Sequence, residues 1–147
     1  MTDQRYIRPG VVTKAFNGIV VLLTRAGLSV AGSRILTVRG RSSGRPRSTP
    51  VNLLTAGDQR YLVSPRGQTQ WVRNLRAAGE GELRVGGRVE RFVSTELSDE
   101  HKPAVLRSYL RRWKFEVGAF FPGLDAGATD DQLLDVAARY PVFEITT

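Results

Sequence analysis

GELRVGGRVERFVST, residues 81–95, is the stretch of the chain that most clearly indicates its fold. Apolar and charged residues alternate on both sides of Gly86-Gly87, and a period of two is typical of strands with one buried face. A glycine pair between two such runs is a turn signal for a hairpin. The stretch therefore predicts a half-buried antiparallel hairpin.

Three further strands are predicted upstream of this hairpin. Residues 34–39 and 48–55 are rich in β-forming side chains and flank a loop punctuated by glycine and proline. Residues 56–59 predict a turn into a third strand at 60–64. Because Pro50 lies inside the second run, we expect that strand to lie at an edge, to begin late, or to carry a bulge.

Helical spacing of apolar residues predicts four helices and is followed by one closing strand. The helices are expected at 9–28, at 69–78 with Thr69 as N-cap, from Ser98 to about Lys114, and from Thr129 to Ala138, and the strand at 142–146. The first helix would cover the sheet or, as an amphipathic basic helix, touch a membrane or a hydrophobic substrate.

This order of elements predicts an α+β fold rather than a regular alternation of strand and crossover helix. We expect a small antiparallel barrel of about six strands with peripheral helices. A length of 147 residues suits a single domain, 1–147, in which residues 1–30 form a helical segment packed on or beside the barrel.

Composition excludes several kinds of site. The chain has no cysteine and one histidine, which excludes disulfides, thiolate metal sites and multi-histidine sites, so no metal is expected. A Ser-His-Asp triad would have to use His101, which lies in a polar segment at a helix start. The N-terminus is polar and the apolar run 18–23 is short, which predicts a cytoplasmic protein.

The charge of the chain is strongly positive. It has 22 basic and 14 acidic residues, a net charge of +8, and only Lys14, Lys102 and Lys114 are lysines. The planar guanidinium of arginine binds phosphate and carboxylate with two hydrogen bonds, so the surplus favours an anionic partner. A bias of codon usage toward arginine would give the same count, and only clustering of the arginines separates the two explanations.

One loop concentrates these arginines. Arg39, Arg41, Arg45 and Arg47 surround two glycines and two serines in residues 39–47. Exposed backbone amides, hydroxyl donors and guanidinium groups are what a phosphate site requires. The loop matches neither the Walker motif nor Gly-x-Gly-x-x-Gly. It is either a phosphate cradle or a solvated hairpin loop.

A second segment repeats this chemistry after the third strand. Residues 64–67 combine a serine, an arginine and a glycine, and the helix that follows carries Trp71, Arg73 and Asn74. A helix N-terminus adds partial positive charge for an anion. Together with the first loop it could clamp one ligand, although Trp71 by itself fits the core equally well.

The two segments together resemble the deazaflavin-dependent nitroreductase family. Residues 40–47, GRSSGRPR, are similar to the family motif Gly-Arg-Lys/Arg-Ser/Thr-Gly-x-x-Arg, which is followed by proline. Residues 71–77, WVRNLRA, are similar to the family's Trp-Tyr-x-Asn-Leu-x-Ala helix. The resemblance spans about residues 35–93.

The resemblance implies a split β-barrel oxidoreductase that binds reduced coenzyme F-420, an 8-hydroxy-5-deazaflavin with a phosphate and several glutamates in its tail. The acceptor would be a small hydrophobic quinone, nitroaromatic or activated enone. The cofactor residues carried over are Arg41, Ser42, Ser43, Gly44, Arg47, Pro50, Val51, Asn52, Ser64, Arg66, Gly67, Trp71 and Asn74. Those of the 41–47 loop would meet the tail, residues 50–52 would flank the ring, and Gly40 and Gly44 would shape the loop.

The chain departs from the family pattern in three places. Ser42 stands where a basic residue is often found, residues 67–70 are shorter than the usual insertion, and Val72-Arg73 replaces a common aromatic pair. The substrate-facing tyrosines of the family lie after Thr95. The aromatic residues available there, as core or as substrate contacts, are Tyr109, Trp113, Phe115, Phe120 and Phe121. Tyr109, Ser64 or water would supply the proton.

Three other interpretations stay open at this stage. Split barrels also bind FMN through arginine and hydroxyl contacts to a phosphate, and the same site could serve a carrier of cofactor or lipid that performs no reaction. Nucleic-acid binding is not expected, because the arginines and aromatic residues form neither a helix-turn-helix nor an RNP pattern. By family analogy the protein would be a monomer or a homodimer.

Overall fold

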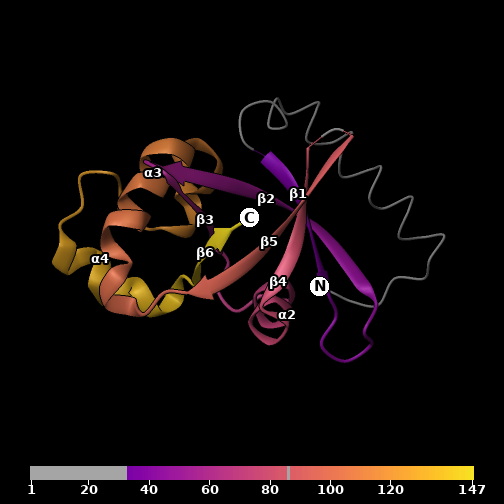
Figure 1. Ribbon diagram of the computed structural model, residues 1–147. Helices are drawn as coiled ribbons and strands as arrows, with labels where there is room; N and C mark the ends of the chain where they lie inside the picture. Colours follow the sequence, from indigo (N-terminus) through magenta and orange to yellow (C-terminus); the bar gives the residue numbers. More distant parts are fainter. Residues whose placement is uncertain (1–32, 86) are drawn as a thin grey trace.

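Six antiparallel strands close into a barrel in the part of the chain that the computed structural model describes, residues 33–85 and 87–147 (Figure 1). The strands are β1 (Ser33–Arg39), β2 (Pro46–Ala56), β3 (Gln59–Val63), β4 (Glu80–Val85), β5 (Arg88–Glu96) and β6 (Val142–Thr146). Their order is β1-β2-β3-β6-β5-β4, and β4 pairs with β1 to complete the ring. The predicted α+β fold with a small split barrel is confirmed.

The long strand β2 changes its partner midway. Residues 46–52 pair with β1, with Pro50 opposite Ile35, and residues 53–56 pair with β3. At Pro50, β2 therefore pairs with β1 on one side and with no described strand on the other. Such an edge position tolerates the missing N–H of proline. The alternative of a late start is wrong, because β2 begins at Pro46.

The turn between β2 and β3 forms as predicted from local sequence. A two-residue turn joins β2 to β3, and its Gly57 has φ of +63°, a conformation that side-chain-bearing residues rarely adopt. The hairpin predicted at 81–95 is confirmed as β4 and β5, with Leu83 opposite Glu90.

Two helices of the C-terminal half lie on one side of the barrel (Figure 1). Helix α3 (Pro103–Val117) follows a 3-10 turn, η1 (Asp99–His101), so the prediction that a helix opens at Ser98 is wrong. The fixed φ and missing N–H of proline suit the first helical position, and the α-helix starts at Pro103. It also ends three residues beyond the predicted Lys114.

Helix α4 (Asp130–Val136) begins where the sequence predicts. The Thr129 hydroxyl accepts from the Gln132 amide at 3.1 Å, and the Gln132 side chain accepts from the Thr129 amide at 2.8 Å. These reciprocal bonds form a capping box. The last turn is a 3-10 helix, η3 (Ala137–Arg139), which ends near the predicted Ala138.

The helix predicted at 9–28, and with it the membrane or substrate contact considered for that helix, lies outside the described residues. Among the residues that the structure describes, no helix is long and apolar enough to cross a membrane.

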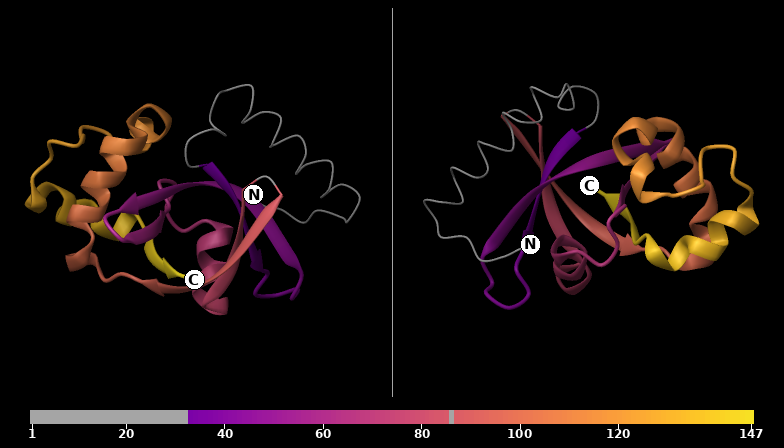
Figure 2. Two further views of the ribbon diagram at one scale, coloured as in Figure 1. Left: turned by 45° about the horizontal axis from the view of Figure 1, so that its top comes forward. Right: turned by 180° about the vertical axis from the view of Figure 1, so that it is seen from behind.

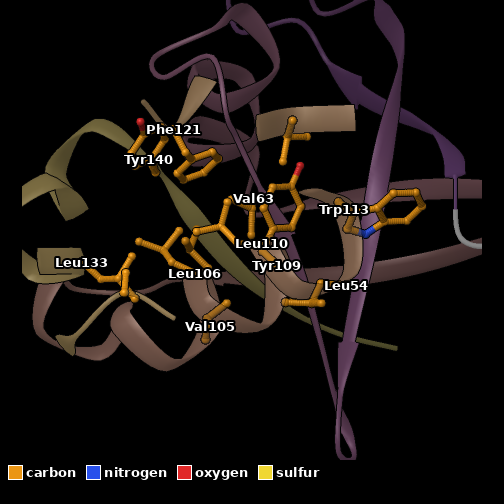
Figure 3. Close-up of a cluster of buried hydrophobic side chains, with 13 residues drawn as sticks. Leu54, Val63, Val105, Leu106, Tyr109, Leu110, Trp113, Phe121, Leu133 and Tyr140 are labelled. Carbon is orange, nitrogen blue, oxygen red and sulfur yellow. The ribbon is translucent and has the colours of Figure 1, made fainter. Parts of the chain in front are cut away.

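Two clusters of buried side chains form the core. One fills the barrel with side chains from all six strands and is covered by α2 (Gln70–Ala78). The other lies between the barrel and α3, where Leu106, Tyr109, Leu110 and Trp113 point inward (Figure 3). The residues proposed for the cofactor lie around the first cluster and along β2, which borders both.

We expect Gly81→Ala to lower the free energy of unfolding by about 1–3 kcal/mol, because overpacking a tight core position forces side chains or backbone to move. A Cβ at Gly81 would lie 2.9 Å from the Phe92 ring and 3.0 Å from the Thr37 carbonyl oxygen. Urea unfolding monitored by circular dichroism measures the change. Gly87→Ala is the matched control, since a Cβ there meets nothing within 4 Å. Equal stability of the two variants would contradict the close approach.

Candidate functional site

The loop between β1 and β2, residues 40–45, has a defined shape. The Gly40 amide donates to the Arg45 carbonyl at 2.8 Å, and the Gly44 amide donates to the Gly40 carbonyl at 2.9 Å. A Cβ at Gly40 would lie 2.8 Å from Ser43 Oγ, and Gly44 has φ of +72°. Gly44 therefore has a backbone conformation that side-chain-bearing residues rarely adopt, and a side chain at position 40 would require Ser43 to move.

Asn74 of α2 holds this loop. Its Oδ1 accepts from the Arg41 amide at 3.1 Å and from Arg41 Nη1 at 2.8 Å. Gln70 Oε1, one turn earlier on α2, accepts from the same Nη1 at 2.9 Å. The Asn74 side chain is buried, with 5% of the residue exposed. The structure therefore brings Arg41 and Asn74, which sequence analysis assigned to one site, into direct contact.

The partners of Arg41 differ in kind from those of several other arginines. Carboxylates pair with Arg60, Arg76, Arg91 and Arg107, through Glu90, Glu96, Glu82 and Asp130 respectively. Within residues 33–85 and 87–147, the side-chain acceptors of Arg41 are the amide oxygens of Gln70 and Asn74, which are neutral. Those amides fix the orientation of the guanidinium without cancelling its charge, so Arg41 remains suited to an anionic ligand.

The N-terminus of α2 lies beside the loop and adds to the same field. The first turn of α2 carries no acidic residue. Thr69 occupies the N-cap position as predicted, but its side chain makes no capping hydrogen bond, and its Oγ1 is buried without a partner among the described residues. The prediction of a Thr69 cap is thus correct in position and wrong in bonding.

The turn at residues 64–67 is built around Ser64. Its buried hydroxyl donates to the Gly67 carbonyl at 2.6 Å, and Gly67 has φ of +83°. Arg66 places its guanidinium carbon 4.7 Å from the centroid of the Phe120 ring, a cation–π contact. The turn therefore links the predicted cofactor residues to the aromatic segment that follows α3.

Along β2, the predicted ring-flanking residues meet α3. Tyr109 is 1% exposed and forms a hydrogen bond with the Asn52 side chain. Burial raises the pKa of Tyr109 well above its ordinary value, and the bond with Asn52 lowers it by less. The phenol therefore stays protonated at neutral pH. Trp113 Nε1 donates to the Leu53 carbonyl at 3.3 Å and fixes α3 against the same strand.

The predicted site residues thus fall into three neighbourhoods. The loop residues Ser42, Ser43 and Gly44 are exposed and Arg47 half-buried, next to the start of α2. Residues 64–67 form a turn whose Arg66 lies over Phe120, and residues 50–52 lie on β2, with Asn52 against Tyr109. Trp71 is half-buried, with its ring centroid 6.0 Å from that of Phe143.

Sequence reasoning missed Gln70, and it did not pair Phe120 with Arg66. Gln70 precedes Asn74 by four positions, so both lie on one face of α2, and that spacing was the available signal. Phe120 was named only as an aromatic residue available after Thr95, and its contact with Arg66 depends on the tertiary fold.

The remaining aromatic residues divide by burial. Tyr109, Trp113 and Phe121 are buried in the core cluster against α3, Phe120 is half-buried, and Phe115 is fully exposed. His101 lies on the surface, where its Nδ1 is 2.9 Å from Ser98 Oγ, three residues away in sequence. This pair belongs to the polar turn before α3 and lies outside the three neighbourhoods.

A family model described as F420H(2)-dependent quinone reductase matches residues 9–116. The chain belongs to this family. It is therefore an oxidoreductase of a family that depends on the reduced deazaflavin coenzyme, in agreement with the resemblance found in the sequence. No curated protein of similar sequence was found.

Solved structures agree with the fold. An F420-H2 dependent reductase, FDR-A, shares 18% identity over 78% of this chain and 93% of its own, with a TM-score of 0.52. A FAD-binding protein from Mesorhizobium loti shares 17% identity over 85% of this chain and 86% of its own, with a TM-score of 0.53.

A protein of unknown function from Agrobacterium tumefaciens has a TM-score of 0.58 at 15% identity. The match covers 90% of this chain, which spans only 54% of the Agrobacterium protein. At these identities the structures show the shared barrel alone.

We expect Asn74→Ala to lower the free energy of unfolding by about 1–3 kcal/mol, because it removes the acceptor of the Arg41 amide and guanidinium. Asn74→Asp keeps an oxygen at that position and should retain most of the stability. Urea unfolding of both variants checks the result. If Asn74→Ala were as stable as the parent, the loop would not depend on α2.

Proposed function

We propose that the loop 40–47 binds the phosphate and glutamate tail of reduced coenzyme F-420. The observation that carries this proposal is the orientation of Arg41, whose amide and guanidinium are both fixed by Asn74 and whose charge no carboxylate of the described residues pairs with. Arginine residues 39, 45 and 47 lie in the same short segment. The donor set suits a polyanion, because guanidinium groups, hydroxyls and a helix N-terminus all favour negative charge.

Each part of the site has a role in this proposal. Arg41, Ser42, Ser43, Gly44 and Arg47 contact the tail, while Asn74 and Gln70 position Arg41. The hydroxyl of Ser43 accepts from the Arg45 amide at 3.1 Å, which leaves its proton available to a phosphate oxygen. Residues Pro50, Val51, Asn52, Ser64, Arg66, Gly67 and Trp71 surround the ring.

The bound coenzyme would supply hydride from C5 of its reduced ring to a quinone, nitroaromatic or enone-type acceptor. The chain's own contribution is binding, orientation and exclusion of water. A proton for the product would come from Ser64, Tyr109 or water. Since the Ser64 hydroxyl bonds the Gly67 carbonyl and Tyr109 is buried, either side chain would deliver its proton only after leaving its present partner.

FMN is the second candidate cofactor, because its single phosphate would also fit the arginine loop. The deazaflavin is preferred because its tail adds carboxylates that use more of the arginines than one phosphate requires. A carrier role without turnover would use the same contacts.

Titration of the purified protein with coenzyme F-420 and, separately, with FMN tests the assignment. We expect a saturable change in deazaflavin fluorescence and weaker binding of FMN. Oxidation of the reduced deazaflavin with a panel of quinones and nitroaromatics then distinguishes an enzyme from a carrier. Tight FMN binding with no deazaflavin binding would reverse the preference.

Arg41→Ala and Arg47→Ala should each weaken deazaflavin binding by about 1–3 kcal/mol, the value of a charge-assisted hydrogen bond, with the barrel still folded. Asn74→Asp should weaken it as well while keeping the loop in place, because a carboxylate cancels the charge of Arg41. Fluorescence titration gives the affinities and circular dichroism the fold. Arg88→Ala, on the exposed β4–β5 hairpin, is the control. Unchanged affinity in both alanine variants at 41 and 47 would refute the site.

A further inference from the structure

Phe115 is a fully exposed aromatic residue near the C-terminal end of α3. Its exposure is 103% of the reference value, although Trp113 and Val117 on either side of it are almost completely buried. A helix that buries positions 113 and 117 turns position 115 toward the solvent. Exposing a phenyl ring to water is unfavourable, and an isolated exposed apolar residue needs a second observation before it indicates a contact.

The segment of α3 that carries the Phe115 side chain is held in place on both sides. Trp113 is held by its bond to the Leu53 carbonyl, and Arg112 lies over the Trp113 ring at 4.2 Å. At Trp113 the backbone leaves helical geometry, with φ of −121° and ψ of 21°, and Val117 then returns to the core. Phe115 therefore projects from a segment that is anchored on both sides.

Two exposed basic residues lie close to Phe115 in the sequence of α3. Arg111 and Lys114 both precede Phe115 on α3, on either side of the irregular residue Trp113, and both are exposed. Glu116 is the only acidic residue in the sequence from 103 to 124. The exposed end of α3 thus combines one apolar side chain, Phe115, with two basic side chains, Arg111 and Lys114. This combination is complementary to a surface that is apolar within and anionic outside.

We propose that Phe115, Arg111 and Lys114 form a docking surface for an anionic lipid membrane. The phenyl ring enters the boundary between headgroups and acyl chains, and the basic side chains contact the lipid phosphates. Three groups give weak, reversible binding, not stable anchoring. This inference does not depend on the identity of the cofactor.

Two other partners fit the surface less well. Single-stranded nucleic acid is bound by several aromatic rings that stack successive bases, whereas Phe115 is the only exposed aromatic side chain among the described residues. A second copy of this chain docked on the same surface would bring Arg111 and Lys114 of both copies together, and repulsion between these like charges opposes association.

The position of the surface is compatible with the proposed site. Helix α3 and the β1–β2 loop lie at opposite ends of the barrel in both views of Figure 2. Strand β2 connects them, and Arg47 and Leu53 are roughly 20 Å apart at the usual rise per strand residue. Residues 50–52 lie between. A membrane at the α3 end would leave the arginine loop in water, where a polyanionic tail would bind.

Sedimentation of the full-length protein with vesicles tests the proposal. We expect binding to vesicles of phosphatidylcholine with phosphatidylglycerol, and weaker binding to phosphatidylcholine alone or at high salt. Phe115→Ser and Lys114→Glu should each reduce the partition coefficient by about tenfold. Leu134→Ser, on the exposed side of α4, and Arg88→Glu are controls matched in polarity and charge and should bind as the parent does.

The proposal is overturned by any of three results. The first is absence of binding to the anionic vesicles. The second is binding that Phe115→Ser and Lys114→Glu leave unchanged, which would place the contact elsewhere in the chain. The third is a loss of self-association or of oligonucleotide binding in these variants with vesicle binding intact. The affinity of the same variants for the deazaflavin should match that of the parent protein. Failure of the membrane proposal can therefore be distinguished from failure of the proposed cofactor site.

Discussion

Insertion of β6 between β3 and β5 is the interaction on which both the barrel and the candidate site depend. The strand pairs with both neighbours, and it contributes Val142 to one core cluster and Phe143 to the other. Without it, two strand edges would present unpaired backbone groups. Its approach also fixes the site, since the Ser64 amide donates to the Pro141 carbonyl at 2.9 Å and Trp71 packs near Phe143. Residues close to the C-terminus therefore position groups more than seventy positions earlier.

Most of the fold could be predicted because its signals are local. Alternation over residues 81–95 and glycine at the turns specify hairpins without knowledge of the rest of the chain. The start of α3 was misjudged because Ser98-Asp99-Glu100 resembles a helix start, while Pro103 determines where α-helical bonding begins. The exposure of Phe115 was predictable in principle from the helical period, but aromatic residues in a helix are usually assigned to the core.

Of the candidate site, the sequence could indicate the residue types but not their pairing. Two separate motifs predicted that the loop and α2 act together. Their contact through Arg41 and Asn74 is a tertiary interaction that only the folded structure shows. Strand β2 explains how distant parts converge. It begins at the arginine loop, changes partner near Asn52, and offers the Leu53 carbonyl to Trp113. One long strand thereby carries the cationic loop at one end and supports α3 at the other.

The surplus of arginine, which composition alone could assign either to codon usage or to an anionic ligand, divides by the chemistry of its partners. Arg76 of α2 donates two hydrogen bonds of 2.7 Å to the carboxylate of Glu96 on β5. That carboxylate raises the pKa of Arg76. Such a pair ties helix to barrel and has its charge matched within the protein. Arg41 faces the same helix yet bonds to amide oxygens. An amide oxygen holds a guanidinium less strongly than a carboxylate does, but it leaves the field of the cation to act on an incoming ligand. The contrast between neutral and charged partners, rather than the number of arginines, is the basis on which Arg41 is proposed as a ligand-binding residue and Arg76 is described as a structural one.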